Sequence, residues 1–128
     1  MKRCVNLKNQ LFEVYRRAFD YREDIKIQTI GPGTTHSNWM FGVRVSGNPG
    51  YDKTEAYFKS YGIEIRPMFY PINEHAHLTN HPDIWGSHNN NARLLSKECF
   101  VLPSFPDLTY TETTHICQTV NNYLKALK

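Results

Sequence analysis

The sequence predicts an α+β fold in which a small, mostly antiparallel sheet is covered on one face by helices. Three observations lead to this prediction. Apolar residues recur at helical spacing near both ends of the chain, short runs between them alternate apolar and polar residues, and glycine and proline separate these runs. The 128 residues, 40% of them hydrophobic, suit one domain with a real core. We therefore expect residues 1–128 to form a single domain.

The first part of the chain predicts one helix and two strands. Residues 6–19 carry an apolar stripe at helical spacing, and Asn6 is the expected N-cap. Residues 25–30 and residues 39–45 alternate apolar and polar positions, as half-buried strands do. The apolar face of the second strand is expected to consist of Trp39, Phe41, Val43 and Val45.

A second helix and a third strand follow. Asp52 and Glu55 have the spacing of a capping box at the start of a helix, and Gly62 suits the left-handed position just after its end. A short strand pattern then alternates apolar and charged residues until Pro67, which cannot donate to a ladder. The alternating residues are Ile63, Glu64, Ile65 and Arg66.

The last part of the chain begins with a polar stretch. Residues 75–91 lack periodicity and predict a long surface loop, whereas residues 92–97 predict one or two helical turns. Residues 99–102 form an apolar run that suits a buried strand, and Thr109 with Glu112 predicts another capping box. The apolar stripe of the final helix is expected to contain Ile116, Val120, Tyr123, Leu124 and Leu127.

Composition excludes several classes of protein. The net charge of +3 is mild and no block of one sign occurs, so nothing requires a nucleic-acid partner. The three cysteines lack the spacing of a disulfide framework or a zinc knuckle, and the cytoplasm is the expected compartment. No apolar run approaches the length of a membrane span, and no export signal is visible.

Some residue types invite a catalytic or metal-binding interpretation. His75, His77 and His81 lie close in sequence, yet no acidic or thiol ligand accompanies them, so a polar loop is the favoured interpretation and no metal is expected. Lys97 could form a Schiff base, but nothing nearby would lower its pKa, so a solvated lysine is favoured. Cys99 lies in an apolar run and is expected to be a buried structural cysteine.

Residues 62–73 (GIEIRPMFYPIN) predict a strand that delivers a stiff aromatic loop behind a single arginine. Arg66 has two interpretations. An arginine at a strand end often pairs with a surface carboxylate, which contributes little to stability. A planar guanidinium beside aromatic side chains also suits recognition of a phosphate or a carboxylate. Both interpretations stay open at this point.

The same segment resembles the pattern G-I-x-x-R-x-x-[FY]-x-P-[LI]-H of the DegT/DnrJ/StrS family of pyridoxal-phosphate (PLP)-dependent nucleotide-sugar aminotransferases. Flanking segments agree in order. Residues 37–45 resemble the family's tryptophan-bearing strand, and residues 52–61 resemble the helix that follows it. Later segments that resemble the family are residues 92–96, 102–104 and 109–112.

The resemblance implies that this chain is the C-terminal small domain of such an enzyme. Residues 1–22 would contain the helix that leads from the large domain, and residues 23–128 would form the α+β core. In the family, the Schiff-base lysine and most PLP-binding groups lie in the large domain, so PLP is expected in the complete enzyme and not on this chain alone. The residues implied to face the nucleotide-sugar substrate are Arg66, Tyr70 and Asn73, supported by Phe69 and Trp39.

One departure from the family pattern concerns Asn73, which stands where the family usually has histidine. An amide can hydrogen-bond a sugar or a phosphate but cannot carry a proton charge. The resemblance also implies partners, namely the aminotransferase large domain or a second copy in a homodimer. Two alternatives remain: a free-standing module that binds nucleotide sugars without catalysis, and a protein-interaction domain that uses the uncovered face of the sheet.

Overall fold

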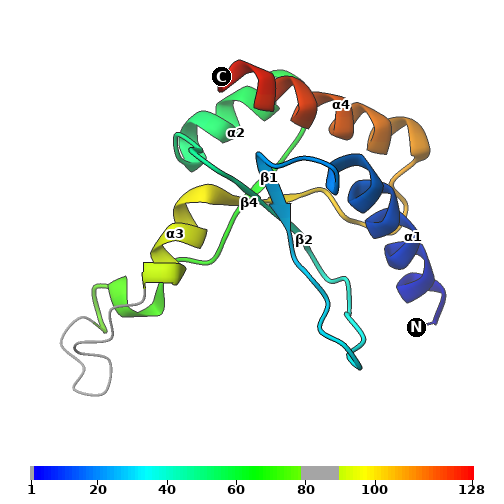
Figure 1. Cartoon of the computed structure of the whole chain (residues 1–128), viewed down its shortest axis with the longest axis horizontal. Helices are drawn as coiled ribbons and strands as arrows, with labels where there is room; N and C mark the ends of the chain where they lie inside the picture. Colours follow the sequence, from blue (N-terminus) through cyan, green and yellow to red (C-terminus); the bar gives the residue numbers. More distant parts are fainter. Residues whose placement is uncertain (1, 79–89) are drawn as a thin grey trace.

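The computed structural model describes residues 2–78 and 90–128. Its helices and short strands are intermixed along the chain, which Figure 1 colours from the N-terminus to the C-terminus. They are α1 (Lys2–Phe19), β1 (Ile25–Ile27), β2 (Phe41–Val45), α2 (Tyr51–Ser60), β3 (Arg66–Pro67), the 3-10 helix η1 (Ile72–Glu74), α3 (Asn90–Glu98), β4 (Cys99–Leu102) and α4 (Tyr110–Ala126).

The strands form one antiparallel sheet in the order β1-β2-β4-β3. The register pairs Val43 of β2 with Ile27 on one side and with Phe100 on the other. Arg66 of β3 pairs with Val101 at the outer edge of the sheet. The predicted α+β class with a mostly antiparallel sheet is therefore confirmed.

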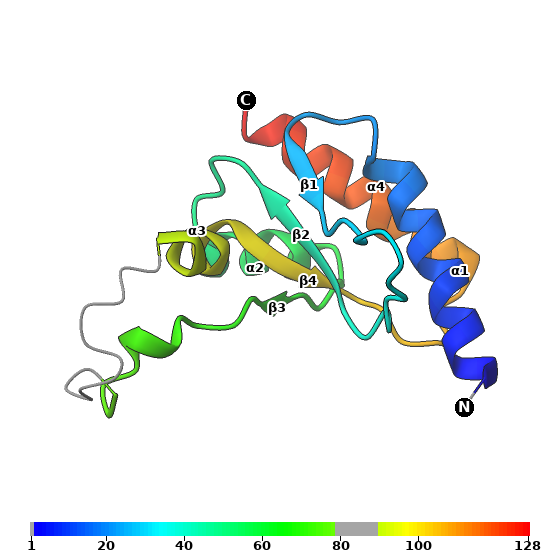
Figure 2. The same ribbon diagram turned by 60° about the horizontal axis from the view of Figure 1, so that its bottom comes forward.

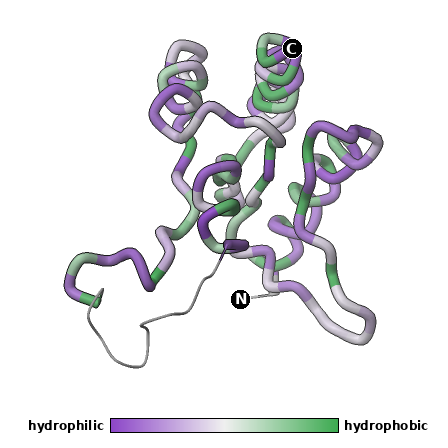
Figure 3. The backbone as a smooth tube through the Cα atoms, turned by 60° about the vertical axis from the view of Figure 1, so that its left-hand side comes forward, coloured by the Kyte–Doolittle hydropathy of each residue, from purple (hydrophilic) through white to green (hydrophobic). Residues whose placement is uncertain are grey.

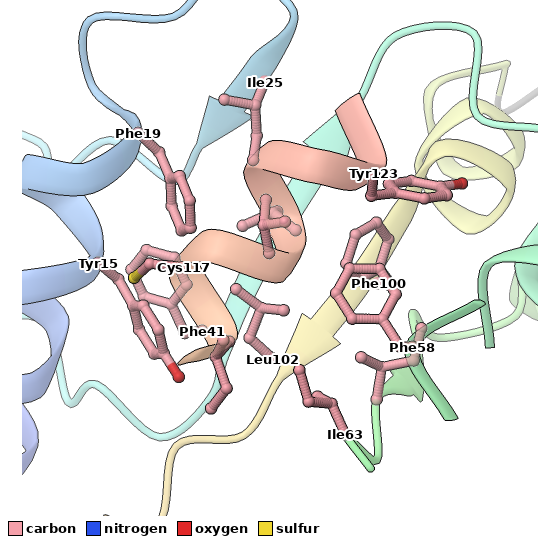
Figure 4. Close-up of a cluster of buried hydrophobic side chains, with 14 of the residues drawn as sticks. Tyr15, Phe19, Ile25, Phe41, Phe58, Ile63, Phe100, Leu102, Cys117 and Tyr123 are labelled. Atoms are coloured by element: carbon pink, nitrogen blue, oxygen red, sulfur yellow. The ribbon is translucent and has the colours of Figure 1, made fainter. Parts of the chain in front are cut away.

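The helices α1, α2 and α4 cover one face of this sheet, as the turned view in Figure 2 shows. Alternation in the strands explains why, because every second residue of β2 and β4 points to the same face. Figure 4 shows Phe41 and Leu102 on this face beside Tyr15 of α1 and Cys117 of α4. The ring of Phe41 lies 4.8 Å from the ring of Tyr15 and 4.9 Å from that of Phe12, measured between centroids.

The other half of the core is aromatic. Phe58 of α2 lies between Phe100 and Tyr123, with ring centroids 5.3 and 5.4 Å away. All three side chains are buried, and such rings each remove a large apolar area from water. The final helix alternates hydrophobic and hydrophilic positions along its length, as the colours of Figure 3 show, because only one of its faces meets this core.

The second face of the sheet is covered only in part by described residues. Gly42 lies on this face, and a Cβ built there would come within 2.9 Å of the Cε of Met68, so the segment after β3 packs directly onto β2. Arg44 donates to Glu98 at 2.7 Å from the same face. Cys99 is buried as predicted, and burial raises the pKa of its thiol.

Segments with a strong local sequence pattern form the helices and strands that were predicted for them. Strand β4 has the predicted bounds, and α3 and α4 occupy the predicted segments. The Thr109 side chain accepts from the Glu112 backbone N–H, and Glu112 accepts from Thr109, so the second capping box is confirmed. Gly62 has a positive φ of 71°, and the N–H groups of residues 62 and 63 bond back to α2, which confirms its place just after that helix.

Several expectations are wrong in detail. Helix α1 begins at Lys2, so Asn6 lies inside the helix and is not its N-cap. Helix α2 has Gly50 at its N-cap without a side-chain hydrogen bond, so Asp52 and Glu55 do not form the predicted box. Strand β1 ends at Ile27 and β2 begins at Phe41, so both are shorter than predicted, and Trp39 is exposed instead of sharing the apolar face of β2. Strand β3 contains only Arg66–Pro67, so it includes Pro67 and omits residues 63–65 of the predicted strand.

The predicted loop over residues 75–91 lies largely outside the described part of the chain, which omits residues 79–89. Within the described part, η1 and a turn up to Leu78 follow the aromatic segment, and α3 already starts at Asn90. His81 falls in the omitted range. None of the helices in residues 2–78 and 90–128 is long and apolar enough to cross a bilayer.

Candidate functional site

Two adjoining hollows of about 670 and 1300 Å³ meet at the segment that leads into β3. We call them the first hollow and the second hollow. The first extends toward α1 and the segment after β4, whereas the second extends along residues 65–70. The residues that line both are Trp39, Met40, Gly62, Ile63, Glu64 and Arg66.

Local contacts fix the segment between the two hollows. The left-handed Gly62 turns the chain away from α2, and the buried side chains of Ile63 and Ile65 anchor it to the core. The hydroxyl of Tyr51 donates to the carbonyl oxygen of Ile65 at 3.0 Å. Arg66 therefore leaves a well-anchored backbone at the edge of the sheet.

Arg66 itself is 75% exposed, and its Nη2 lies 3.4 Å from the carboxylate of Glu64, which is equally exposed. An ion pair of this kind contributes little to stability because water screens both charges. The structure thus gives Arg66 the surface carboxylate partner of the first interpretation and also places it on the rim of both hollows. Its guanidinium is accessible to an anionic ligand group.

Two aromatic side chains form a wall beside this arginine. The rings of Trp39 and Phe69 are stacked, with centroids 6.5 Å apart and planes inclined by 29°. Their exposed fractions are 66% and 68%, although Trp39 lies before β2 and Phe69 follows β3. A stacked pair held open to solvent offers a flat apolar surface to a ring-shaped ligand.

Tyr70 continues this wall along the second hollow. Its ring meets that of His75 edge to face at a centroid distance of 5.3 Å. Asn73 lies in η1, half-buried, and is not among the described residues that line either hollow. The structure therefore brings Trp39, Arg66, Phe69 and Tyr70 together along the second hollow.

The first hollow contains polar residues that the sequence did not single out. The Lys8 Nζ donates to the carbonyl oxygen of Trp39 at 2.6 Å and to the Ser104 Oγ at 3.4 Å, and burial lowers the pKa of this amine. His115 lies across the hollow, where its Nε2 is 3.0 Å from the carbonyl oxygen of Tyr61. In the sequence, Lys8 looks like any other polar residue beside an apolar stripe.

The histidine segment does not assemble a metal site within the described residues. The rings of His75 and His77 are 5.7 Å apart between centroids. No group of three or more metal-binding side chains gathers anywhere in residues 2–78 and 90–128. Lys97 is exposed on α3, in agreement with the solvated role favoured from sequence.

Comparison with known proteins identifies the fold and a family. The sequence model of the DegT/DnrJ/EryC1/StrS aminotransferase family matches residues 1–121. No curated protein matches the sequence.

Solved structures agree in fold. The aminotransferase TlmJ from Streptoalloteichus hindustanus superposes with a TM-score of 0.82 at 16% identity, over 97% of this chain and 32% of that one. The sugar aminotransferase CalS13 from Micromonospora echinospora gives 0.77 at 12% identity, over 93% and 30%. The PLP form of Spr1654 from Streptococcus pneumoniae gives 0.83 at 16% identity, over 98% and 32%. The chain thus spans about a third of each of these proteins.

Proposed function

Because this chain belongs to the DegT/DnrJ/EryC1/StrS aminotransferase family, we propose that it is the C-terminal small domain of a sugar aminotransferase and binds one side of a nucleotide-sugar substrate. The observation that carries this proposal is the exposed aromatic wall beside Arg66, where the two hollows meet. Residues 1–22 would connect to the large domain, and residues 23–128 would form the substrate-facing core.

The chemistry of this site suits binding. The Arg66 guanidinium can offer paired donors to the oxygens of a phosphate group. Because this side chain is exposed, it can do so without its charge being buried. The stacked rings of Trp39 and Phe69 offer an apolar surface to a sugar or a base, and the Tyr70 hydroxyl offers a donor and an acceptor. Together these groups would orient the ligand and exclude water from one side of it. A contact between Asn73 and the ligand stays a prediction.

In the complete enzyme, PLP would supply the electron sink for transfer of an amino group to a keto-deoxy sugar. The described residues do not fit this cofactor by themselves. Lys59 and Lys97 are exposed, and the amine of Lys8 already donates to two oxygens of the fold. The proposed partners are the aminotransferase large domain and a second copy of the assembled enzyme.

The proposal also includes the cellular compartment of the enzyme. All three cysteines are free thiols, and two of them are buried. Free thiols are the normal state of cysteine in a reducing compartment. We propose the cytoplasm, where nucleotide sugars would meet the enzyme.

Chemical-shift mapping tests the substrate-facing site. Titration of dTDP-, UDP- and GDP-sugars into the chain should shift the Trp39 indole resonance and the amide resonances of residues 66 and 68–70, because these groups line the hollows. Arg66→Ala should weaken the effect about tenfold, the order of one charge-assisted phosphate contact. Lys53→Ala, at an exposed position of α2, is the matched control. Shifts confined to other surfaces would contradict the proposed site.

Reconstitution tests the domain role. The chain is purified with a candidate large domain, and PLP absorbance and transamination are measured before and after mixing. Restored activity that depends on Arg66 supports the small-domain role over both alternatives. Saturable binding by the chain without any gain of activity with a large domain supports the free-standing binding module instead.

A further inference from the structure

Trp39 is fixed in an unusual way for a residue of a candidate ligand site. Its side chain is 66% exposed, so burial does not hold the ring in place. Its backbone is fixed by helix α1, because the Lys8 Nζ donates to the Trp39 carbonyl oxygen at 2.6 Å. The neighbouring residue Asn38 donates to the Asn9 side chain at 2.5 Å and has a left-handed φ of 50°. The turn before β2 therefore depends on α1 for its conformation.

Lys8 also reaches a third segment of the chain. Its amine lies 3.4 Å from the Ser104 Oγ, just after β4. Tyr15, two turns further along α1, donates its hydroxyl to the carbonyl oxygen of Pro103 at 2.7 Å. Lys8 thus joins α1, the turn before β2 and the segment after β4, and it lines the first hollow at their junction.

The ring contact makes this backbone bond relevant to the ligand site. Trp39 stacks on Phe69, which follows the edge strand β3 and lies far from this turn in the sequence. If the Trp39 backbone shifts, the ring must leave the stack or pull Phe69 with it. A charge-assisted hydrogen bond to the Trp39 carbonyl opposes that shift.

We propose that Lys8 is a positioning residue that holds Trp39 against Phe69 and thereby couples helix α1 to the aromatic wall. Its relevance to a nucleotide sugar rests on the function proposed above, whereas the coupling itself is a property of the chain alone. Under the proposed domain arrangement, α1 would connect to the large domain, so a displacement of that helix would reach Trp39 itself through the Lys8 ammonium group, beside the bond that Asn9 makes to Asn38.

The coupling is measured without any ligand by fluorine NMR. The sequence has two tryptophans, Trp39 and Trp85, so 5-fluorotryptophan in a Trp85→Phe background labels Trp39 alone. Phe69→Leu removes the stacked ring and defines the resonance position of an unstacked Trp39. We expect Lys8→Met, which keeps the aliphatic stem, to move the resonance at least halfway toward that position. Lys8→Arg should restore part of the parent signal because it keeps the charged donor.

Controls make each outcome decisive. Lys53→Met removes an exposed lysine from α2 and should leave the resonance unchanged. Lys8→Gln, which is too short to reach the carbonyl, replaces Lys8→Met if that variant does not give a folded spectrum. The proposal is overturned if the neutral variant that folds gives the same Trp39 resonance as the parent, or if Phe69→Leu itself causes no shift. Failure of the nucleotide-sugar titration alone would refute the proposed ligand and leave the coupling intact.

The link to binding has its own readout. Where the nucleotide-sugar titration succeeds, Lys8→Met should weaken binding about three- to tenfold. The same substitution should have little further effect in a Trp39→Ala background, because interacting groups are not additive. Equal losses in both backgrounds would show that Lys8 acts on the ligand by a route other than Trp39.

Discussion

At the scale of single residues, the most demanding arrangement is a buried polar triad between α2 and α4. Asn48, Thr54 and Tyr123 are almost completely buried, and their side chains meet at 2.6 to 2.9 Å. The amide oxygen of Asn48 accepts from both hydroxyl groups, and the Thr54 Oγ1 also lies 2.8 Å from the Gly50 carbonyl oxygen. Each group in such a network is costly to leave without its partner.

Thr54→Val and Tyr123→Phe should therefore each lower the free energy of unfolding by about 1–3 kcal/mol, the cost of a buried unsatisfied polar group. The loss in the double variant should be smaller than the sum of the single losses because the two hydroxyls share Asn48. Urea unfolding measures all three values. Tyr110→Phe, at an exposed position of the same helix, is the control and should change the value by less than about 0.5 kcal/mol.

At the scale of elements, the sequence predicts the helices and strands that local residue spacing determines. It does not predict features that depend on contacts between residues far apart in the chain. Strand β4 and the Thr109 cap of α4 follow from their own residues. The exposure of Trp39 does not, because α1 meets the turn before β2 across 31 residues at Lys8. The segment with Arg66 carries a local pattern that could be recognised in the sequence. The role of Lys8 could not be predicted, because it depends on a contact with a residue far along the chain.

The contact between β2 and the segment after β3 gives a prediction at this scale. Gly42→Ala should shift the methyl resonance of Met68, because the new Cβ would lie 2.9 Å from the present position of its Cε. The free energy of unfolding should change by less than about 1 kcal/mol, since a methionine end can rotate away. A Met68 resonance that does not move would contradict this packing.

A second glycine provides the opposite case as a control. Gly47 has a φ of 74°, and a Cβ at this position would meet nothing within 4 Å. Gly47→Ala should cost about 1 kcal/mol through backbone strain alone and leave the Met68 resonance in place. The two variants therefore separate steric contact from conformational strain, read by carbon NMR of labelled methionine and by urea unfolding.

At the scale of the whole molecule, one ionic cluster ties the loop between α1 and β1 to the end of α4. Arg22 donates to both carboxylate oxygens of Asp24 at 2.6 and 2.8 Å and to the Asn121 side chain of α4 at 3.1 Å. Lys128 lies 3.5 Å from the same carboxylate. The cluster joins this loop to the C-terminal part of the chain through Asn121 and Lys128.

This cluster predicts how stability responds to acid. The hydrogen bond from Arg22 lowers the pKa of Asp24 from its ordinary value of 3.8 to about 2. The stabilisation is therefore present above pH 3.8 and is lost as the pH falls toward 2, because the unfolded chain binds the proton first. Compared with Asp24→Asn, the parent should be more stable by about 1 kcal/mol at pH 6, a value reduced for solvent screening.

Urea unfolding at pH 6 and at pH 2 checks this difference. The advantage of the parent should be mostly lost at the lower pH, where protonation of the Asp24 carboxyl competes with the bond from Arg22. A parent that keeps its advantage at both values would show that the carboxylate charge is not what stabilises the cluster.

The packing of α1 against α4 also sets the order in which the chain can fold during synthesis. Tyr15 and Phe19 share one core with Cys117, Val120 and Leu124, so the first helix has no complete partner until the last helix has left the ribosome. Strand β2 pairs with β4, which follows it by more than fifty residues, so this pairing cannot form until β4 has been synthesised. The core around α1 therefore cannot be completed until α4 has been synthesised, and contacts between residues so far apart in sequence slow folding.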